Sequence, residues 1–439
     1  MAPVADISTV SGRRIKVRKS ALCLGLLAFG LLNTLPAFGQ QNPVVITRHP
    51  ATVDSSTFSS LNMKQKHMAF NKLSASTNAA TQKQDPRIVS VPNFTRSFTF
   101  GGQTFPYTMV GQDPTKAQTT EVPTQYIPMS FFFDEFIDQN GNNIVIDTTA
   151  ITDEIKHSPL FDSAPFANGF TQYEDAQMRA EFFPLFHNKS HNGDGDGDDS
   201  FHVVLGHPQT LLPVQIEVPV GSSEVFVDSN GTFFALIDIN FISSQLNTLL
   251  QTEPINVQSI PIFLTRNAVY GDFSKQQPVD CCIGGFHTAF ETNQINNKIF
   301  VQTFAFSTSL DSDVSAALFG DPTIFADIFA LTHELGELLN DPFVNNVTPN
   351  YQLPGLPPGA CQNNLEVGDL IENLPNPSQP LTLHGFTYHP QTLGLLQWFE
   401  GINPSDGFNG DYSFPDPTVL TVKGGTAPFT PCPPSAPAP

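Results

Sequence analysis

Residues 321–342 read D-P-T-I-F-A-D-I-F-A-L-T-H-E-L-G-E-L-L-N-D-P, and this stretch predicts a buried helix with both ends marked. Asp321 can accept hydrogen bonds from the free amides of the first turn, and Pro322 suits the first helical position. Pro342 cannot continue the helix and disfavours helical geometry at Asp341. Six apolar residues recur between the ends at spacings of three, four and one: Ile324, Ile328, Leu331, Leu335, Leu338 and Leu339. A face of this width is typical of a helix packed in a core.

A polar group interrupts this apolar stretch. His333 and Glu337 are four residues apart, so they lie one turn apart on the same side of the helix. A histidine and a carboxylate at this spacing can bind one metal ion, and Glu334 beside the first ligand can act as general base. The alternative is a solvated polar edge with a local ion pair. Gly336 costs about 1 kcal/mol inside a helix, which indicates close packing or a site at this point.

A third metal ligand must come from elsewhere in the chain. Asp341 lies eight residues beyond His333, which is about 12 Å along a helix axis. Ligand atoms must converge to about 2 Å from the ion, so we assign Asp341 to the helix end or to the surroundings of the ligands. Glu366 and Asp369 follow a reversal of the chain and can approach from the other side. One of these two carboxylates is therefore the expected third ligand.

Three other histidines are assigned less directly. His384 and His389 are reserve ligands. His287 stands inside a predicted strand, where a histidine is more often a core residue than a ligand. We therefore leave His287 out of the predicted site.

The N-terminal residues predict export. Five basic residues precede the apolar run 21–32: Arg13, Arg14, Lys16, Arg18 and Lys19. Ala37 and Gly39 place small residues at the −3 and −1 positions of a cleavage site, so residues 1–39 are interpreted as a signal peptide. The apolar run is too short for a membrane-spanning helix, and no later apolar run is long enough to span a bilayer. We expect an exported, extracellular or periplasmic protein without a membrane span in the mature chain.

The chain is acidic, with a formal net charge of −21 at pH 7. This balance argues against nucleic acid or anionic lipid as a partner and is compatible with binding of divalent cations. Residues 192–199 read N-G-D-G-D-G-D-D, like the start of a calcium loop, but Val203 stands where an EF-hand has its closing glutamate. A solvated acidic loop is the preferred interpretation. The alternative is a Ca²⁺ site on three aspartates, Asp194, Asp196 and Asp198.

Four cysteines follow the predicted signal peptide: Cys281, Cys282, Cys361 and Cys432. An even number in an exported chain permits two disulfides. A bond between adjacent cysteines closes a strained ring, so we expect Cys281 and Cys282 each to bond to one of Cys361 and Cys432. Which one each bonds to stays open. A zinc site made of cysteines alone would need tighter spacing.

Changes in amino-acid composition and pattern divide the rest of the chain into segments. Residues 40–92 are polar and predict a leader or pro-segment, residues 93–254 are rich in predicted strands, and residues 431–439 form a Pro/Ala tail. A hairpin is predicted around Gly101 and Gly102, and helical patterns occupy residues 171–183 and 233–250. Further strands are predicted at residues 126–133, 202–205, 214–218, 260–264, 285–290 and 299–306.

The motifs resemble those of a loose group of secreted proteins. The stretch His333-Glu334-Leu335-Gly336-Glu337, the Asn-Asp-Pro at residues 340–342 and Glu366-Val367-Gly368-Asp369 carry the resemblance. Plant Exordium (phosphate-induced) proteins and uncharacterised bacterial exported proteins have a similar helix and turn, and Gly285-Phe286-His287 is similar to their Gly-Trp-His strand. The resemblance covers about residues 255–415. It implies an α+β fold in which residues 255–430 form a zincin-like mixed sheet with an active-site helix.

Three functions are compatible with these features. The first, which we adopt, is a secreted metal-dependent hydrolase, specifically a zinc peptidase acting on a peptide or protein. Zn²⁺ would bind His333, Glu337 and one of Glu366 or Asp369, with Glu334 as general base. The second is a non-catalytic exported binding or structural protein on a zincin-like scaffold. The third is a structural protein stabilised by calcium at the Asp-Gly loop.

Overall fold

The computed structural model describes residues 51–52, 87–187, 201–274, 281–295, 298–421 and 431–432. The described residues belong to one compact unit, residues 49–439. The predicted signal peptide and the predicted calcium loop with Asp194, Asp196 and Asp198 lie outside the described residues, as does most of the predicted leader.

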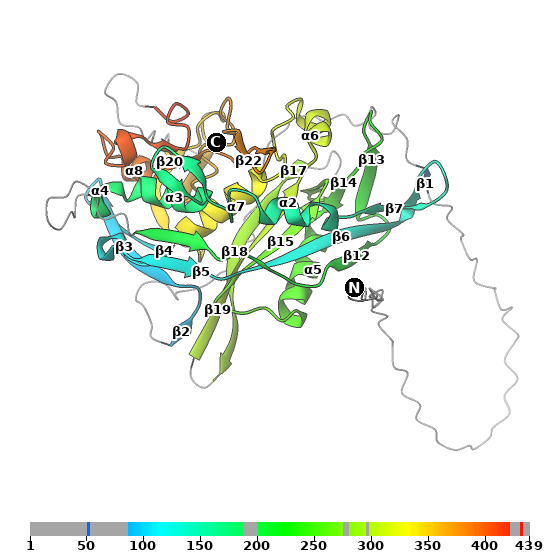
Figure 1. The fold of residues 1–439 in the computed structure, drawn as a ribbon, viewed down its shortest axis with the longest axis horizontal. Coiled ribbons are helices and arrows are strands. Elements are labelled where there is room, and N and C mark those ends of the chain that lie inside the picture. Colours follow the sequence, from blue (N-terminus) through cyan, green and yellow to red (C-terminus); the bar gives the residue numbers. More distant parts are fainter. Residues whose placement is uncertain are drawn as a thin grey trace, which may run out of the picture. The chain divides into compact units, whose positions relative to one another are not determined.

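A nine-stranded mixed sheet organises the fold. Its central strands are β6 (Thr124–Ile137), β15 (Ile260–Arg266) and β19 (Lys298–Ser309), and β15 is parallel to both neighbours. β18 (Gly285–Ile295) follows at the edge and is antiparallel to β19 (Figure 1). The remaining strands of this sheet are β1 (Ala51–Thr52), β2 (Ile88–Val89), β7 (Asn143–Ile146), β11 (Gln209–Thr210) and β12 (Val214–Val218).

The amino acids of the central strands explain their position. β15 reads I-P-I-F-L-T-R, and six of these seven residues are buried. A continuous apolar run of this kind is typical of a strand covered on both faces. Strands from both sides of residue 254 pair in this sheet, so the segments 93–254 and 255–430 share it. The fold class is mixed α+β, as the sequence predicts.

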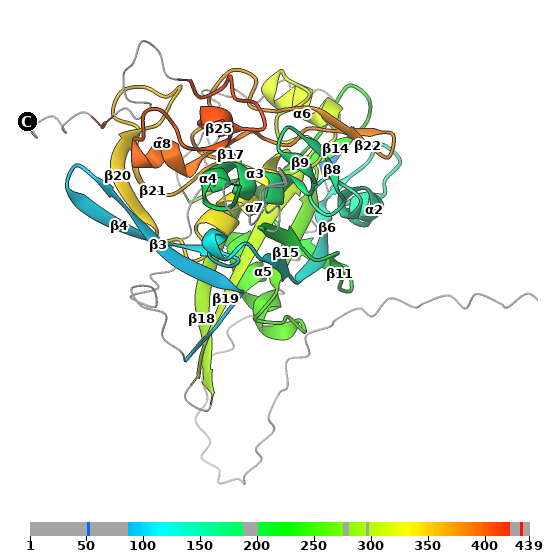
Figure 2. The same ribbon diagram turned by 60° about the vertical axis from the view of Figure 1, so that its left-hand side comes forward.

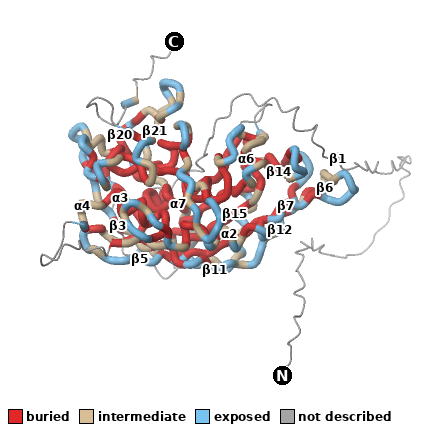
Figure 3. The backbone as a smooth tube through the Cα atoms, turned by 45° about the horizontal axis from the view of Figure 1, so that its top comes forward, coloured by how far each residue is buried: buried red, intermediate tan, exposed pale blue. Residues whose placement is uncertain are grey.

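The helix at the centre of the fold is α7 (Phe329–Asn340), and all twelve of its residues are buried. It packs against β18 and β19, and α3 (Tyr173–Glu181) lies beside it (Figure 2). The burial of α7 is visible in Figure 3, where it lies among the buried segments of the interior. The helix ends one residue before Asp341, as Pro342 predicts.

The predicted start of this helix, Pro322, is wrong by seven residues. Asp321 does not cap it. Its carboxylate instead accepts hydrogen bonds from the backbone N and the hydroxyl of Thr323, at 2.8 and 2.7 Å. Phe325 and Asp327 have left-handed backbone angles, with φ of 56° and 42°, which a helix does not contain. An isolated β-bridge between Ala326 and Leu310 keeps residues 321–328 in a non-helical conformation. The helix α7 therefore begins only at Phe329.

Of two smaller predictions, the hairpin is confirmed and the helix at 233–250 is wrong in its first part. The predicted hairpin is β3 (Asn93–Phe100) and β4 (Gln103–Val110), with positive φ at both glycines of the turn. The helical pattern at 233–250 is a helix only in its second part: β14 (Phe233–Asp238) is a strand, and α5 (Ile239–Thr252) follows it. The cause is tertiary, because β14 pairs with both β13 (Ser223–Val227) and β16 (Ala268–Gly271).

The remaining elements surround this framework. The helices are α2 (Thr152–Lys156), α4 (Phe183–Phe186), α6 (Ser312–Phe319) and α8 (Leu396–Glu400). The strands are β5 (Thr119–Val122), β8 (Ala164–Phe166), β9 (Gly169–Thr171), β10 (His202–Leu205), β17 (Cys281–Ile283), β20 (Val347–Gln352), β21 (Cys361–Asn364), β22 (Leu381–Leu383), β23 (Phe386–Tyr388), β24 (Leu393–Gly394) and β25 (Ser413–Phe414). Among the helices of the described segments, none is long and apolar enough to cross a membrane.

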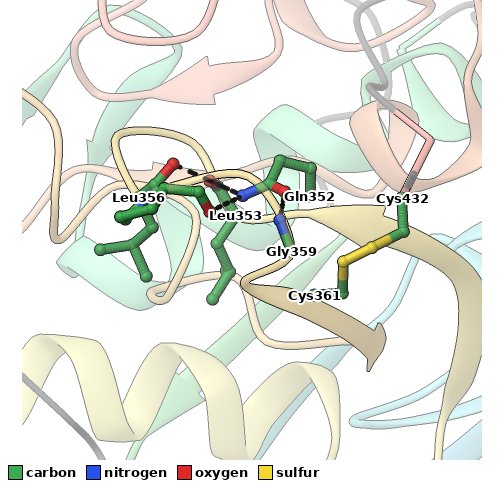
Figure 4. Close-up of a disulfide and its surroundings, with 7 residues drawn as sticks. Gln352, Leu353, Leu356, Gly359, Cys361 and Cys432 are labelled. Atoms are coloured by element: carbon green, nitrogen blue, oxygen red, sulfur yellow. Dashed lines mark hydrogen bonds between the residues drawn. A yellow bond between two sulfur atoms is a disulfide. The ribbon is translucent and has the colours of Figure 1, made fainter. Parts of the chain in front are cut away.

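The disulfides differ from the predicted pairing. Cys281 bonds to its neighbour Cys282, and Cys361 bonds to Cys432 (Figure 4). The reason is that β17 lies in a four-stranded sheet with β13, β14 and β16, whereas β21 pairs with β20 in a separate sheet. The backbone N of Cys432 donates to Asn350 O at 3.2 Å, which holds Cys432 beside β20.

The Cys361–Cys432 disulfide closes a long loop. The two cysteines are 71 residues apart in the sequence, and their Cα atoms are 6.0 Å apart. A cross-link over this length lowers the conformational entropy of the unfolded chain. In the chain-entropy model this stabilises the folded protein by about 4 kcal/mol. It is anchored at the first residue of β21, the strand that leads into the loop containing Glu366 and Asp369.

Candidate metal centre

The structure brings together all five residues that the sequence predicts for the metal and its chemistry. α7 provides His333, Glu334 and Glu337, and the loop after β21 provides Glu366 and Asp369. A sixth residue, His287 of β18, joins them. Each of the six is at most 6% exposed. The alternative of a solvated polar edge is therefore wrong, and we refer to these six residues as the centre.

Three ligand atoms of the centre have the spacing of a metal site. His333 Nε2 lies 3.2 Å from Glu337 Oε1 and 3.6 Å from Asp369 Oδ1. Ligand atoms about 2.0–2.2 Å from a tetrahedral ion are separated by about 3.4 Å from one another. His333, Glu337 and Asp369 can therefore hold a Zn²⁺ ion with little rearrangement. Asp369 is the better candidate for the third ligand of His333 and Glu337.

A buried glutamine sets the tautomer of His333. His333 Nδ1 lies 2.9 Å from Gln391 Oε1, while Gln391 Nε2 donates to Gly368 O at 2.7 Å. Because the amide nitrogen is used by the carbonyl of Gly368, the amide oxygen must accept from His333 Nδ1. This assignment follows from the hydrogen-bond network. The proton on Nδ1 leaves the lone pair on Nε2 for a metal.

The electrostatics of the centre favour a cation. Burial alone lowers the pKa of His333, but the carboxylates around it, with Glu337 the strongest, raise that pKa well above its usual value. Burial likewise lowers the pKa of His287, and the carboxylate of Glu366 and its neighbours outweigh it. Both imidazoles are thus surrounded by negative charge. A proton or a metal ion satisfies this arrangement.

Two amides of β21 orient the carboxylates of the loop. Gln362 Nε2 donates to Asp369 Oδ2, and Asn364 Nδ2 donates to Glu366 Oε1, each at 2.5 Å. The other oxygen of each carboxylate faces a histidine: Asp369 Oδ1 faces His333, and Glu366 Oε2 faces His287. Amides that hold a ligand in this way commonly improve metal affinity by about 10- to 100-fold.

The loop also packs directly on α7. The backbone N atoms of Gly368 and Asp369 donate to Glu337 Oε1 at 3.3 and 3.2 Å. A Cβ atom on Gly368 would lie 2.5 Å from His333 Nδ1 and 2.7 Å from its Cγ. Only glycine lets the loop pass this close to the imidazole.

Gly368→Ala is expected to reduce zinc affinity by about 10-fold or more and the free energy of unfolding by about 1–3 kcal/mol. The added methyl must displace either the His333 ring or the loop that contains Asp369. Isothermal titration with Zn²⁺ and denaturant unfolding measure the two effects. Gly284→Ala is the control, since its Cβ would lie 2.8 Å from the Phe325 ring and crowds no ligand. Unchanged zinc affinity in Gly368→Ala would contradict the placement of the loop.

Glu334 lies on the side of the centre that faces β18. Its Oε2 is 3.5 Å from His287 Nδ1, and a Cβ on Gly285 would lie 2.9 Å from its Oε1. Both carboxylate oxygens are buried and make no hydrogen bond. Burial raises the pKa of Glu334 to about 7. A carboxyl group with such a pKa can both accept and release a proton near neutral pH.

The close packing predicted at Gly336 is confirmed. A Cβ there would lie 2.3 Å from Leu393 Cδ1 and 3.2 Å from Glu174 Oε2. Glu174 belongs to α3, is fully buried, and has its pKa raised well above the usual value by burial. The glycine therefore lets α3 and β24 approach the same turn of α7.

The other predicted residues lie outside the centre. Asp341 is at the C-cap of α7, where its Oδ1 accepts from the backbone N of Asn345 at 2.9 Å and of Asn346 at 3.1 Å. Of the two reserve ligands, His384 is exposed and lies 3.0 Å from Asp162. His389 lies 2.7 Å from Asp327. Neither of the two histidines approaches α7 as a ligand.

Sequence reasoning missed two residues of the centre and its surroundings. His287 is paired with Ala305 in the β18–β19 ladder, and only the register of β18 against α7 brings it to Glu337. The one sequence signal was the similarity of Gly285-Phe286-His287 to a Gly-Trp-His strand. Gln391 lies 58 residues from its partner His333 and stands in no recognisable motif.

The chain matches no family model, and no curated protein or solved structure shows significant similarity to it.

Proposed function

We propose that this protein is a metal-dependent hydrolase with a zincin-like fold, and that it acts as a zinc peptidase. Zn²⁺ would be held by His333, Glu337 and Asp369. The observation that carries this proposal is the spacing of their three ligand atoms, at 3.2 and 3.6 Å from His333 Nε2. The tautomer imposed by Gln391 supports it, because that tautomer presents the lone pair of Nε2 to the ion.

The residues divide the chemistry among them. A divalent cation held by His333, Glu337 and Asp369 would supply Lewis-acid chemistry, which would polarise the scissile carbonyl and lower the pKa of an attacking water to about 7. Glu334 takes a proton from that water as the water oxygen bonds to the carbonyl carbon, and then passes the proton to the leaving amine as the C–N bond breaks. The raised pKa of Glu334 suits both transfers.

The position of β18 supports a peptide as the substrate. Among the described strands, β18 pairs with β19 alone, so its second edge has no strand partner there. An extended peptide can add to such an edge through main-chain hydrogen bonds. His287 places this strand beside Glu334 and Glu337. The two disulfides support an exported location, extracellular or periplasmic, since such bonds persist in oxidising compartments.

One observation favours a second candidate, a non-catalytic scaffold stabilised by a metal. The side chains of His333, Glu334 and Glu337 are at most 3% exposed. Structural metal sites are closed in this way, whereas a catalytic site keeps a position for water or substrate. Such a protein would bind the ion to join α7 to the loop containing Asp369.

Metal analysis combined with a peptide library tests the proposal. The purified mature protein is expected to contain zinc after mild purification or after dialysis against Zn²⁺, and to cleave peptides of the library. A chelator should remove both the zinc and the cleavage, and added Zn²⁺ should restore them. Protein that takes up no zinc would refute the metal centre. Zinc without cleavage of any peptide would favour the scaffold.

A further inference from the structure

The centre contains a second set of ligand atoms that the proposed zinc site does not use. His287, Glu337 and Glu366 each offer an atom within 4.8 Å of the others. His287 Nδ1 lies 3.4 Å from Glu337 Oε2, and His287 Nε2 lies 3.9 Å from Glu366 Oε2. One imidazole and two carboxylates again form the set, as at His333.

Glu337 belongs to both sets through different oxygens. Its Oε1 faces His333 Nε2 at 3.2 Å, and its Oε2 faces His287 Nδ1 at 3.4 Å. A carboxylate whose two oxygens point to two ligand sets is the usual bridge between metal ions about 3.5–4 Å apart. The two histidines come from different elements, α7 and β18, so the shared glutamate lies between them.

The charges of the centre match two divalent cations. Four carboxylates surround the two imidazoles: Glu334, Glu337, Glu366 and Asp369. With neutral imidazoles, the four carboxylates have four negative charges, which two divalent ions balance. With one divalent ion, protons in the centre would have to balance the other two negative charges, whereas two divalent ions balance all four without a proton.

The imidazole of His287 has no complete set of hydrogen bonds that would explain its burial as a core residue. His287 Nε2 is buried and makes no hydrogen bond, although a buried histidine in a core normally satisfies both ring nitrogens. Asn364 holds Glu366 through Oε1, so that its Oε2 faces His287. Gln362 and Asp369 repeat this arrangement at the other histidine. Each set therefore has its own histidine and its own oriented carboxylate.

We propose that the centre binds two divalent cations, the first at His333 and Asp369, the second at His287 and Glu366, with Glu337 bridging them. Ligands of one imidazole and two carboxylates suit Zn²⁺ and Mn²⁺. This proposal rests on the proposed function only through the metal site that shares Glu337. It requires that the centre binds metal, but it does not require hydrolysis. It changes His287 from a core residue into a ligand.

The test counts ions per chain in the full mature protein. An exposed group of His157, Asp162 and His207 could also bind an ion, so all variants are made in a His207→Gln background. After dialysis against Zn²⁺ and gel filtration, the background protein is expected to contain two zinc ions. His287→Phe and Glu366→Gln should each contain one. Glu366→Gln keeps the size of the side chain, so it serves if His287→Phe fails to fold.

Loading the protein with Mn²⁺ gives a second measurement, the magnetic coupling between the two ions. A purely structural role of Glu366 would not affect this coupling. Two Mn²⁺ ions joined by a carboxylate are magnetically coupled, so the loaded background protein should give a coupled electron paramagnetic resonance signal. Glu366→Gln should convert this signal into that of an isolated ion. Asp369→Asn is the matched control on the other side of Glu337 and should give the same conversion.

The outcomes separate this proposal from the proposed function. One zinc ion in the background protein, unchanged in Glu366→Gln and lost in Asp369→Asn, would refute the second ion and leave the zinc site of the proposed function intact. No zinc in any protein would refute both. Two ions that are both retained in Glu366→Gln and His287→Phe would show that the second ion lies elsewhere.

Discussion

Glu334→Gln is expected to lower peptide hydrolysis by about 100- to 10,000-fold, the usual contribution of a general base, while the metal content stays the same. Glutamine keeps the size of the side chain, so the packing against Gly285 is preserved. It cannot accept a proton from water, and Glu334 belongs to neither ligand set. Hydrolysis of a library peptide and zinc analysis of the same preparation measure the two properties.

The control for this variant is Glu291→Gln, an exposed glutamate on the same strand as His287. It should keep both hydrolysis and zinc. If Glu334→Gln cleaves peptides as fast as the wild type, Glu334 is not the base. If it loses its zinc, Glu334 is a ligand, and its distance of 3.5 Å from His287 Nδ1 would need to be reinterpreted in that way.

Glu337→Gln is expected to have the largest effect on metal binding, because both ligand sets include Glu337. The amide that replaces the carboxylate carries no charge and has one oxygen instead of two. Zinc should therefore be lost from the whole centre, and hydrolysis should be lost with it. The wild type should gain about 2.7 kcal/mol of stability at a zinc concentration 100 times its dissociation constant, and the variant should gain none.

Thermal unfolding with and without Zn²⁺ measures this difference directly. Glu121→Gln, at an exposed position of β5, is the control and should respond to zinc as the wild type does. Glu337→Gln that still binds zinc at the wild-type stoichiometry would show that neither ligand set holds the ion. If Glu337→Gln unfolds on purification, Asp369→Asn serves as the second test of the ligand set that contains His333.

The sequence predicts α7 better than the surroundings of that helix. The spacing of His333 and Glu337 and the stop at Pro342 are local features, and both agree with α7. The start of α7 is not local, since it depends on a bridge between Leu310 and Ala326. A capping pattern at Asp321 could not show that the chain forms non-helical turns after this residue and before the helix begins.

The same distinction between local and tertiary features holds for the candidate ligands. The chain reversal between α7 and residues 366–369 predicts that Glu366 and Asp369 lie near the helix, and the structure agrees. His287 and Gln391 could not be placed, because each reaches the centre through tertiary contacts of distant elements. The disulfide pairing failed for a related reason: which cysteines meet depends on which sheet each strand joins.

The order of strands in the large sheet has a kinetic consequence. β6 pairs with β15 across more than a hundred residues, from Thr124 to Ile260, and such non-local pairings form slowly. The centre is complete only when β18, α7 and the loop containing Asp369 have all docked. Before that, its carboxylates are separated and hydrated, and they bind a cation poorly. A bound metal should therefore slow the unfolding of the finished protein and leave its rate of folding almost unchanged.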